Sequence, residues 1–500
     1  MSGTMTLYGR APAGLRNLGS DADDAITLGR LVHRDGSIGH RIRIGEALPT
    51  LVIGPNGSGK GTRFLMPNLL QNNGASLVVV DPKGELTAVS APFRRQFSRV
   101  VVLNPFNVLV DIPGYEDMKS EGYNPFIDFD PASPSFNVKT SLLAEAIVPI
   151  TGREREPHWD ESARSMVSAF AMYTVLEAQR LGMTPTIERM RELICEASFA
   201  PSEANNFEGV GIPKRALEMM KSGIPGLANK ASQFSDWNRE IQSIASTARR
   251  HTESFDDPEI AADLAKGTFD FHDLKREPTT VYLILPPEMM ERHAKWLRLI
   301  LTSAIHSCLR ARRPGEPKVI FLIDEFHALG RLDLITNVWA LTRGYGVQIV
   351  PVLQDLNQLK RLYPDMWETF IGMAGAVVSF APNDITTAQW METRAGFATR
   401  LADTMNENLS RSITDSGGRS SGGNGSSNTG WSVADTSSKN TSSAPVKVPL
   451  MSAHQMYGLE PGYLMIALNG LQNVVPAYAP AYYQIHECIA RARANPYYQR

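Results

Sequence analysis

A chain of 500 residues predicts about three structural units, which is long enough to bury a large core. Its 50 basic and 52 acidic residues give a formal net charge of −2, so no chain-wide positive field can hold nucleic acid and any such contact must be local. With 43% hydrophobic and 20% charged residues, the composition is that of a globular protein and excludes general disorder.

Cysteine usage and hydropathy predict the compartment. Cys195, Cys308 and Cys488 lie far apart in the sequence, which argues against a disulfide framework and a cysteine metal site and fits a reducing environment. The apolar runs are far shorter than the ~20 residues that span a bilayer, and the first residues lack the pattern of a signal peptide. We therefore expect a cytoplasmic chain that reaches a membrane only through a partner.

Short β-branched runs alternate with amphipathic stretches, the pattern of an α/β protein with a mostly parallel sheet. Seven runs are predicted to be buried strands: Thr50–Ile53, Leu77–Val80, Val100–Leu103, Thr280–Leu285, Val319–Ile323, Val347–Leu353 and Ala376–Phe380. Ligands of such sheets bind beyond the carboxyl ends of the strands, so the residues after each run are where chemistry is expected.

The first strand runs directly into a Gly-x-x-x-x-Gly-Lys motif that precedes a predicted helix, which is the context of a phosphate-binding loop. The loop consists of Gly54, Pro55, Asn56, Gly57, Ser58, Gly59, Lys60 and Gly61. Its backbone N–H groups would surround the phosphates of ATP and Lys60 would add a point charge. Gly61 stands where most such loops carry the Ser or Thr that ligates Mg²⁺, so the hydroxyl must come from Thr62, from Ser58 or from a water.

A helical tract interrupts the α/β pattern between the third and fourth strands. Asp160–Leu181 carries an apolar stripe and stops at Gly182, and further helical stretches follow up to about residue 268. The sequence therefore predicts an N-terminal soluble segment (1–45), a nucleotide-binding domain in two parts (46–182 and 269–500) and an all-alpha domain between them (183–268).

The fifth strand ends in two acids, the form of a Walker B element. Asp324 would hold Mg²⁺ through its water shell, and Glu325 would orient and deprotonate the water that attacks the γ-phosphate. An apolar run that ends in acids is a weak signal by itself, because many strands end in solvated carboxylates. Together with the phosphate loop at Lys60, the two acids become a strong signal for a Walker B element.

Two further polar positions complete the predicted site. Gln354 follows the sixth strand, where a RecA-like ATPase often places a glutamine that senses the γ-phosphate; a polar residue that merely closes the strand is the alternative. RecA-like sites lie between subunits and use an arginine from the neighbour. Arg343 is the first candidate and Arg394 the second, with a solvated surface arginine as the alternative for both.

The segment 410–443 has an unusual composition, because 25 of its 34 residues are Ser, Gly, Thr or Asn. It offers too little apolar surface to order itself, so we expect a flexible loop inside the second part of the nucleotide-binding domain. The Gly-x-Ser-x-Gly match at 418–422 lies within this segment rather than at a strand-to-helix turn, which excludes a nucleophile elbow.

Taken together, the motifs at 54–61, 324–330 and 354–358, with Asp-Pro-Lys-Gly-Glu at 81–85, resemble the type IV secretion coupling proteins, the TraG/TraD-type conjugation ATPases. The likeness runs in order from about residue 45 to 485. It implies a RecA/FtsK-like P-loop motor interrupted by an all-alpha, substrate-selecting domain and assembled as a homohexamer. Such a motor uses ATP to feed a relaxase-bound single strand of DNA, or a protein effector, to channel components.

The resemblance also directs attention to residues outside the phosphate loop. Asp81, at a strand tip, could help to order the Mg²⁺ waters, whereas Lys83 and Glu85 could equally be turn and helix-cap residues. Arg249, Arg250 and His251 form a small basic cluster in the predicted all-alpha domain, and a solvated helix face is the alternative to DNA binding.

The resemblance implies one difference from the family. Its usual members begin with membrane helices, whereas we expect a soluble segment over residues 1–45 here. We expect weak hexamer formation in isolation and docking at the inner face of the bacterial inner membrane through a separate anchoring partner. Two other functions remain open: a FtsK/HerA-like pump for double-stranded DNA, and a recruitment adaptor that uses ATP only as a switch. The ATP-driven coupling translocase is the leading hypothesis; Gly61 and the expected lack of an anchor lend some support to the adaptor.

Overall fold

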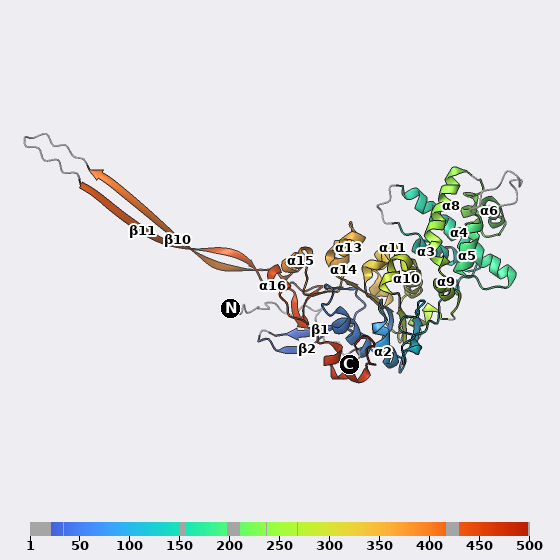
Figure 1. The fold of residues 1–500 in the computed structure, drawn as a ribbon, viewed down its shortest axis with the longest axis horizontal. Helices are drawn as coiled ribbons and strands as arrows, with labels where there is room; N and C mark the ends of the chain where they lie inside the picture. The colour runs from blue at the N-terminus through green and yellow to red at the C-terminus, as the bar shows by residue number, and fades with distance from the viewer. Residues whose placement is uncertain are drawn as a thin grey trace, which may run out of the picture.

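The computed structural model describes residues 22–33, 35–150, 156–197, 211–236, 238–267, 269–416 and 430–498. Figure 1 shows a main body built on a sheet, a helical region at one end and a long two-stranded ribbon at the other. Residues 1–21 of the expected N-terminal segment lie outside the described residues, as do residues 417–429 with the Gly-x-Ser-x-Gly match.

The strands are β1 (Ile26–Val32), β2 (Ile38–Ile44), β3 (Thr50–Ile53), β4 (Ser76–Val80), β5 (Arg99–Leu103), β6 (Thr279–Leu283), β7 (Val319–Ile323), β8 (Val347–Leu353), β9 (Ala376–Phe380), β10 (Phe397–Ser416), β11 (Gly430–Pro449), β12 (Tyr463–Leu468) and β13 (Val475–Tyr478). The seven runs predicted from the sequence are β3 to β9, with ends that differ by at most two residues.

The helices are α1 (Met66–Gln71), α2 (Glu85–Arg94), α3 (Phe136–Ile147), α4 (Pro157–Leu181), α5 (Ile187–Ala197), α6 (Ile212–Met220), α7 (Pro225–Ser232), α8 (Arg239–Thr252), α9 (Pro258–Ala265), α10 (Pro287–Cys308), α11 (Asp333–Val338), α12 (Thr342–Tyr345), α13 (Leu356–Leu362), α14 (Trp367–Met373), α15 (Ile385–Ala395), α16 (Ala453–Tyr457) and α17 (His486–Arg491). Across the described part of the chain, none of these helices has both the length and the apolar character that a bilayer span requires.

Eleven strands form one sheet in the order β2-β1-β13-β12-β9-β3-β8-β7-β4-β6-β5. Seven neighbouring strands in this order, β9-β3-β8-β7-β4-β6-β5, are mutually parallel, so the predicted mostly parallel α/β sheet is confirmed. Because β3, β8 and β7 are neighbours in this order, the residues that follow them lie at one edge of the sheet.

The central strands are buried on both faces, which explains their continuous apolar runs. Along β3, Leu51 and Ile53 belong to one core cluster and Val52 to the other, as the two-residue period of a strand requires. The cluster around Val52 includes residues of α1 and α2, whereas the cluster around Leu51 includes residues of α3, α4 and α10. The phosphate loop thus starts from a strand that is fixed between two cores.

The helical region is formed by α4 to α9 (Figure 1). It includes α4, which the sequence analysis assigned to the nucleotide-binding domain, because α4 packs against α5, α7 and α8. The boundary expected at residue 183 falls in the connection between α4 and α5. The imidazole Nε2 of His251 on α8 lies 3.0 Å from a carboxylate oxygen of Asp160 on α4, which joins the two longest helices of this region.

The structure corrects two expectations about the periphery of the sheet. The described part of the N-terminal segment is no separate unit, because β1 pairs with β13 and β2 with β1, both antiparallel. Within 410–443, the described residues are not an irregular loop: they belong to β10 and β11, which pair in one unbroken register from Phe397 opposite Pro449 to Ser416 opposite Gly430. Backbone groups pair across an antiparallel ribbon without a core, so a polar sequence can adopt it.

Candidate nucleotide-binding site

The phosphate loop closes a tight turn between β3 and the helical residues 60–65. Gly57 and Gly59 have φ values of 79° and 94°, a conformation that side chains with a Cβ rarely adopt. A Cβ on Gly54 would lie 2.7 Å from Ser58 Oγ and 2.9 Å from Phe380 Cβ, so the backbone leaves no room there for a larger residue. The glycine spacing in the sequence is therefore required by the geometry of the loop.

Lys60 is folded over the loop that it follows. Its ammonium group donates hydrogen bonds to the carbonyl oxygens of Gly54 and, at 3.1 Å, Pro55. Burial lowers the pKa of Lys60, while the nearby carboxylates of Asp324 and Glu325 act in the opposite direction. The charge of Lys60 is thus held among the loop carbonyls and close to the two acids, although 264 residues separate the lysine from Asp324 in the sequence.

The residues after Lys60 decide which hydroxyl faces the site. Nothing lies within 4 Å of a Cβ built on Gly61, so that position opens into free space. Thr62 lines the same cavity as Lys60, and its hydroxyl donates a long hydrogen bond of 3.4 Å to the carbonyl of Gly59. Ser58 Oγ is buried without a hydrogen-bond partner and is not part of the cavity wall. The geometry favours Thr62 over Ser58.

The two acids follow β7 and face Lys60. Burial raises the pKa of Asp324 to about 7, and the neighbouring Glu325 carboxylate adds to the shift. The pKa of Glu325 is lowered, chiefly by the imidazole of His327, whose Nδ1 lies 3.2 Å from Glu325 Oε2. Glu325 is also one of the few residues other than glycine with a left-handed backbone, at φ 51°, a strained conformation of the kind found at functional sites.

Gln354 follows β8, which lies between β3 and β7 in the sheet. Its side-chain amide Nε2 lies 3.4 Å from Glu325 Oε2, as a donor at the limit of hydrogen-bond length. Its backbone N–H donates to the side chain of Gln358 at 2.9 Å, which fixes the turn into α13. The sheet thus brings Lys60, Glu325 and Gln354 together from the tips of three strands.

Asp81 ends β4, on the other side of β7. One carboxylate oxygen accepts hydrogen bonds of 2.7 Å from both the backbone N–H and the hydroxyl of Thr87, and burial raises the Asp81 pKa to about 6. Glu85, at the start of α2, accepts a hydrogen bond of 2.7 Å from the side-chain amide of Asn495. Asp81 therefore both organises the turn into α2 and lines the cavity.

These residues line one open cavity of about 1970 Å³ at the carboxyl edge of the parallel strands. Its donor set fits a nucleoside triphosphate with Mg²⁺, because the carboxylates of Asp324 and Glu325 and the hydroxyl of Thr62 offer oxygen ligands and Lys60 offers a positive charge to the phosphates. Within the described ranges no three His, Cys, Asp or Glu side chains cluster as metal ligands. Mg²⁺ that binds together with a nucleotide keeps several waters and takes only one or two carboxylates besides the phosphate oxygens.

The two candidate arginines lie outside the wall of this cavity. Arg343 is two-thirds exposed and pairs with Glu46 at 3.0 Å. The Arg394 guanidinium donates hydrogen bonds to three backbone carbonyls at the turn between β12 and β13, which is the contact set of a structural arginine. An action of Arg343 on a neighbouring subunit stays a prediction.

The basic cluster on α8, formed by Arg249, Arg250 and His251, makes several contacts within the helical region. The His251 side chain pairs with Asp160, and burial lowers the pKa of His251. The backbone carbonyl of Arg249 accepts a hydrogen bond of 2.8 Å from Arg191. The Arg250 guanidinium is 69% exposed and lies 3.7 Å from Asp160, and Arg249 is also exposed, so these two arginines face solvent.

A protein family described as type IV secretory system conjugative DNA transfer matches residues 15–491. The chain belongs to this family. Among related proteins, the conjugal transfer protein TraG of Escherichia coli is 23% identical over 381 residues, which are 70% of this chain and 55% of TraG. The protein VirD4 of Rhizobium radiobacter is 26% identical over 362 residues, 70% of this chain and 48% of VirD4. The chain thus spans about half the length of these relatives.

A solved structure of the plasmid coupling protein TrwB in complex with ADP and Mg²⁺ has the same fold, with a TM-score of 0.59. It is 15% identical, and the match covers 88% of each chain. The coupling-protein fold of this chain, with its helical insertion, is confirmed by this likeness.

The cavity wall also contains residues that the sequence analysis did not predict. His327 and Arg361 belong to the wall, as do several aromatic residues between Tyr482 and Tyr498. His327 lies two positions after Glu325, so the Walker B element could have indicated it. The aromatic residues carry no local signal, because they reach the site only through the tertiary fold.

Proposed function

We propose that this chain is the ATPase of a type IV secretion coupling protein, which recruits a relaxase-bound single strand of DNA or a protein effector and drives it into the secretion channel. One observation carries the proposal. Lys60, on the loop after β3, and the acids Asp324 and Glu325, after β7, share one cavity at the carboxyl edge of the same sheet. A P-loop ATPase needs this meeting of cation and acids.

Each residue has a role that follows from its position. Lys60 and the loop N–H groups hold the phosphates, and Asp324 and Thr62 would hold Mg²⁺, which would neutralise the charge that develops on the transferred phosphoryl group. Glu325 has a lowered pKa and is therefore ionised at neutral pH, the form that accepts a proton from the attacking water. Gln354 lies close enough to Glu325 to orient that water.

The proposal extends to the assembly. The site is open to solvent on one side, so we propose that it is completed by a neighbouring subunit of a homohexamer, with Arg343 as the arginine supplied in trans. The helical region formed by α4 to α9 would select the substrate. A separate membrane partner and the channel components would place the ring at the inner face of the inner membrane.

The test is the rate of ATP hydrolysis with and without DNA. The proposal expects turnover that single-stranded DNA stimulates and that both Lys60→Ala and Glu325→Gln abolish. Stimulation by duplex DNA alone would instead indicate a pump for double-stranded DNA. Absence of turnover under every condition, with ATP still bound, would indicate a recruitment adaptor. Survival of hydrolysis in both variants would remove the proposed site.

A further inference from the structure

The cavity has two kinds of wall. Lys60, Asp324 and Gln354 supply charged and polar groups to the cavity wall, which suits a triphosphate. Another part is supplied by the segment 482–498, with four tyrosines: Tyr482, Tyr483, Tyr497 and Tyr498. A nucleoside triphosphate whose phosphates lie at Lys60 must place its base elsewhere in the same cavity, and aromatic surface is what a base can stack on.

The segment 492–498 is held firmly against α2 and the turn before it. The backbone N–H of Arg493 donates to the Val89 carbonyl at 2.9 Å, and its side chain donates to the carbonyl of Ala88 at 2.6 Å and to Asp117 at 2.8 Å. The Tyr115 hydroxyl donates to the Ala494 carbonyl at 2.7 Å. This network fixes the backbone just before the exposed tyrosines.

Tyr497 is fixed at both ends. Its hydroxyl donates to the carbonyl of Lys83 at 2.7 Å, and its backbone N–H donates to the Asn495 side chain at 3.0 Å. The amide of Asn495 in turn donates to Glu85, which closes the link to the start of α2. The ring between these two anchors is nevertheless 49% exposed and forms part of the cavity wall. Such a ring offers a rigid face at little cost in side-chain entropy.

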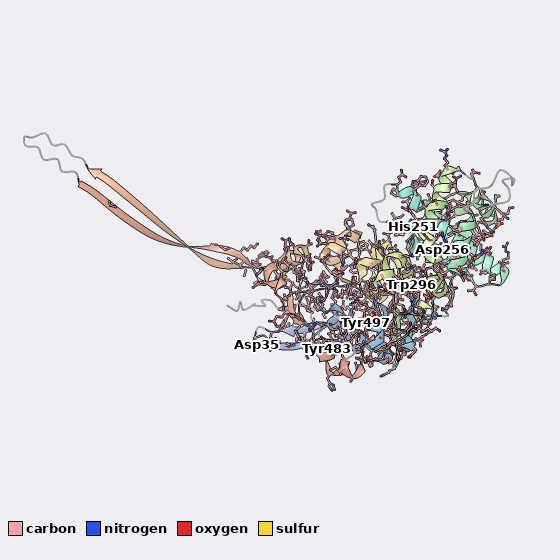
Figure 2. All side chains as sticks on the ribbon, viewed as in Figure 1. Asp35, His251, Asp256, Trp296, Tyr483 and Tyr497 are labelled. Atoms are coloured by element: carbon pink, nitrogen blue, oxygen red, sulfur yellow. The ribbon has the colours of Figure 1, made fainter. Side chains whose placement is uncertain are left out.

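Figure 2 shows Tyr483 and Tyr497 in the main body, away from the helical region that carries His251 and Asp256. Tyr483 is 57% exposed and packs edge-on against Tyr482, with ring centroids 5.4 Å apart. Tyr482 is only 9% exposed, so Tyr483 presents the larger open face of the two. The fold thus holds Tyr497 and Tyr483 on the wall of one cavity, each with part of its ring uncovered.

We propose that Tyr497 is the stacking platform for the purine base of the nucleotide, with Tyr483 as a second aromatic wall. The inference rests on the proposed function, because it assumes that the phosphates bind at Lys60. It also couples base binding to the Asp-Pro-Lys-Gly-Glu turn, since the Tyr497 hydroxyl is bonded to the Lys83 carbonyl within that turn.

The experiment measures binding of two probes to the full chain by calorimetry, in the presence of Mg²⁺: a non-hydrolysable ATP analogue and inorganic tripolyphosphate. Tyr497→Ala should weaken binding of the analogue about 5- to 150-fold, the range expected for loss of one base–aromatic stack. It should leave tripolyphosphate binding within about twofold of the wild type, because that probe has no base. Tyr497→Phe keeps the ring and should retain most of the affinity.

Tyr457→Ala is the matched control, since Tyr457 on α16 is 40% exposed and is not part of the cavity wall. It should change neither affinity. The inference is overturned if Tyr497→Ala binds the analogue as the wild type does, or if it weakens both probes equally, which would indicate a structural role. Lys60→Ala tests the proposed function independently of the stacking inference, because loss of the lysine should weaken the binding of both probes. If wild type binds neither probe, or Lys60→Ala binds both normally, the proposed site itself is wrong.

Discussion

Asp324→Asn should stabilise the metal-free protein at pH 8. The Asp324 carboxyl is partly buried beside a second carboxylate, and desolvation together with that neighbouring charge raises its pKa from 3.8 to about 7. A pKa that is higher in the folded state means that the folded protein holds this proton more tightly. The contribution to stability is therefore intact below about pH 4 and is lost as the pH rises to 7. Asparagine has nearly the same shape and carries no charge at any of these pH values.

The magnitude follows from the shift. About three pH units at ~1.4 kcal/mol each give a cost of ~4 kcal/mol for ionised Asp324 above pH 7. The shift already includes the attraction of Lys60, so the gain in the variant should be about 2 to 4 kcal/mol at pH 8, with the lower end set by an imperfect fit of the amide. At pH 5.5 the wild type has incurred only about half of this cost, so the gain should shrink by about 2 kcal/mol.

Urea unfolding in EDTA, followed by tryptophan fluorescence at pH 5.5 and pH 8, measures the difference. The exposed Asp365 provides the control, because Asp365→Asn should change stability by less than about 0.5 kcal/mol at either pH. If Asp324→Asn is no more stable than the wild type at pH 8, or gains the same amount at both pH values, the argument that Asp324 is held ionised at a cost is refuted.

Three other predictions concern catalysis and packing. Glu325→Gln should lower kcat for ATP hydrolysis at least about 100-fold and leave ATP binding intact, whereas Lys60→Ala should lose both, as steady-state rates and calorimetry would measure. Arg298→Met should destabilise the fold by about 2 to 4 kcal/mol in urea unfolding, because the buried guanidinium donates to three backbone carbonyls, including two just after the Walker B element. Trp296→Phe should cost about 1 to 3 kcal/mol in the same assay, since it removes the 2.9 Å hydrogen bond from the indole N–H to the buried Asp263 carboxylate.

Each of these has an outcome that would contradict it. If the Glu325→Gln variant no longer binds ATP, Glu325 is needed for the structure of the nucleotide site and not only for catalysis. Arg298→Met with wild-type stability would mean that the three carbonyls find water instead. Trp296→Phe with an unchanged urea midpoint would mean that the hydrogen bonds from other groups already satisfy Asp263.

Local signals in the sequence were enough to predict the elements that carry the chemistry. A strand shows its burial by a run of β-branched residues, and a phosphate loop shows its turns by glycines at fixed spacing, because both depend on neighbours only a few residues away. That is why β3 to β9, Lys60 and the two acids could be found without coordinates. The resemblance to coupling proteins rested on the same motifs.

What depends on pairing between distant segments could not be predicted in this way. The antiparallel edge of β12, β13, β1 and β2 joins the two ends of the described chain, and the polar ribbon of β10 and β11 is held by backbone pairing that leaves no hydrophobic pattern. Tyr497 meets the Lys83 carbonyl across 414 residues. The raised pKa of Asp324 likewise arises from the partial burial that the packed strands impose and from the charge of Glu325. Sequence determined which groups are present and their local conformation; tertiary structure decided which of them share a cavity and at what electrostatic cost, because burial and proximity are properties of the packed chain.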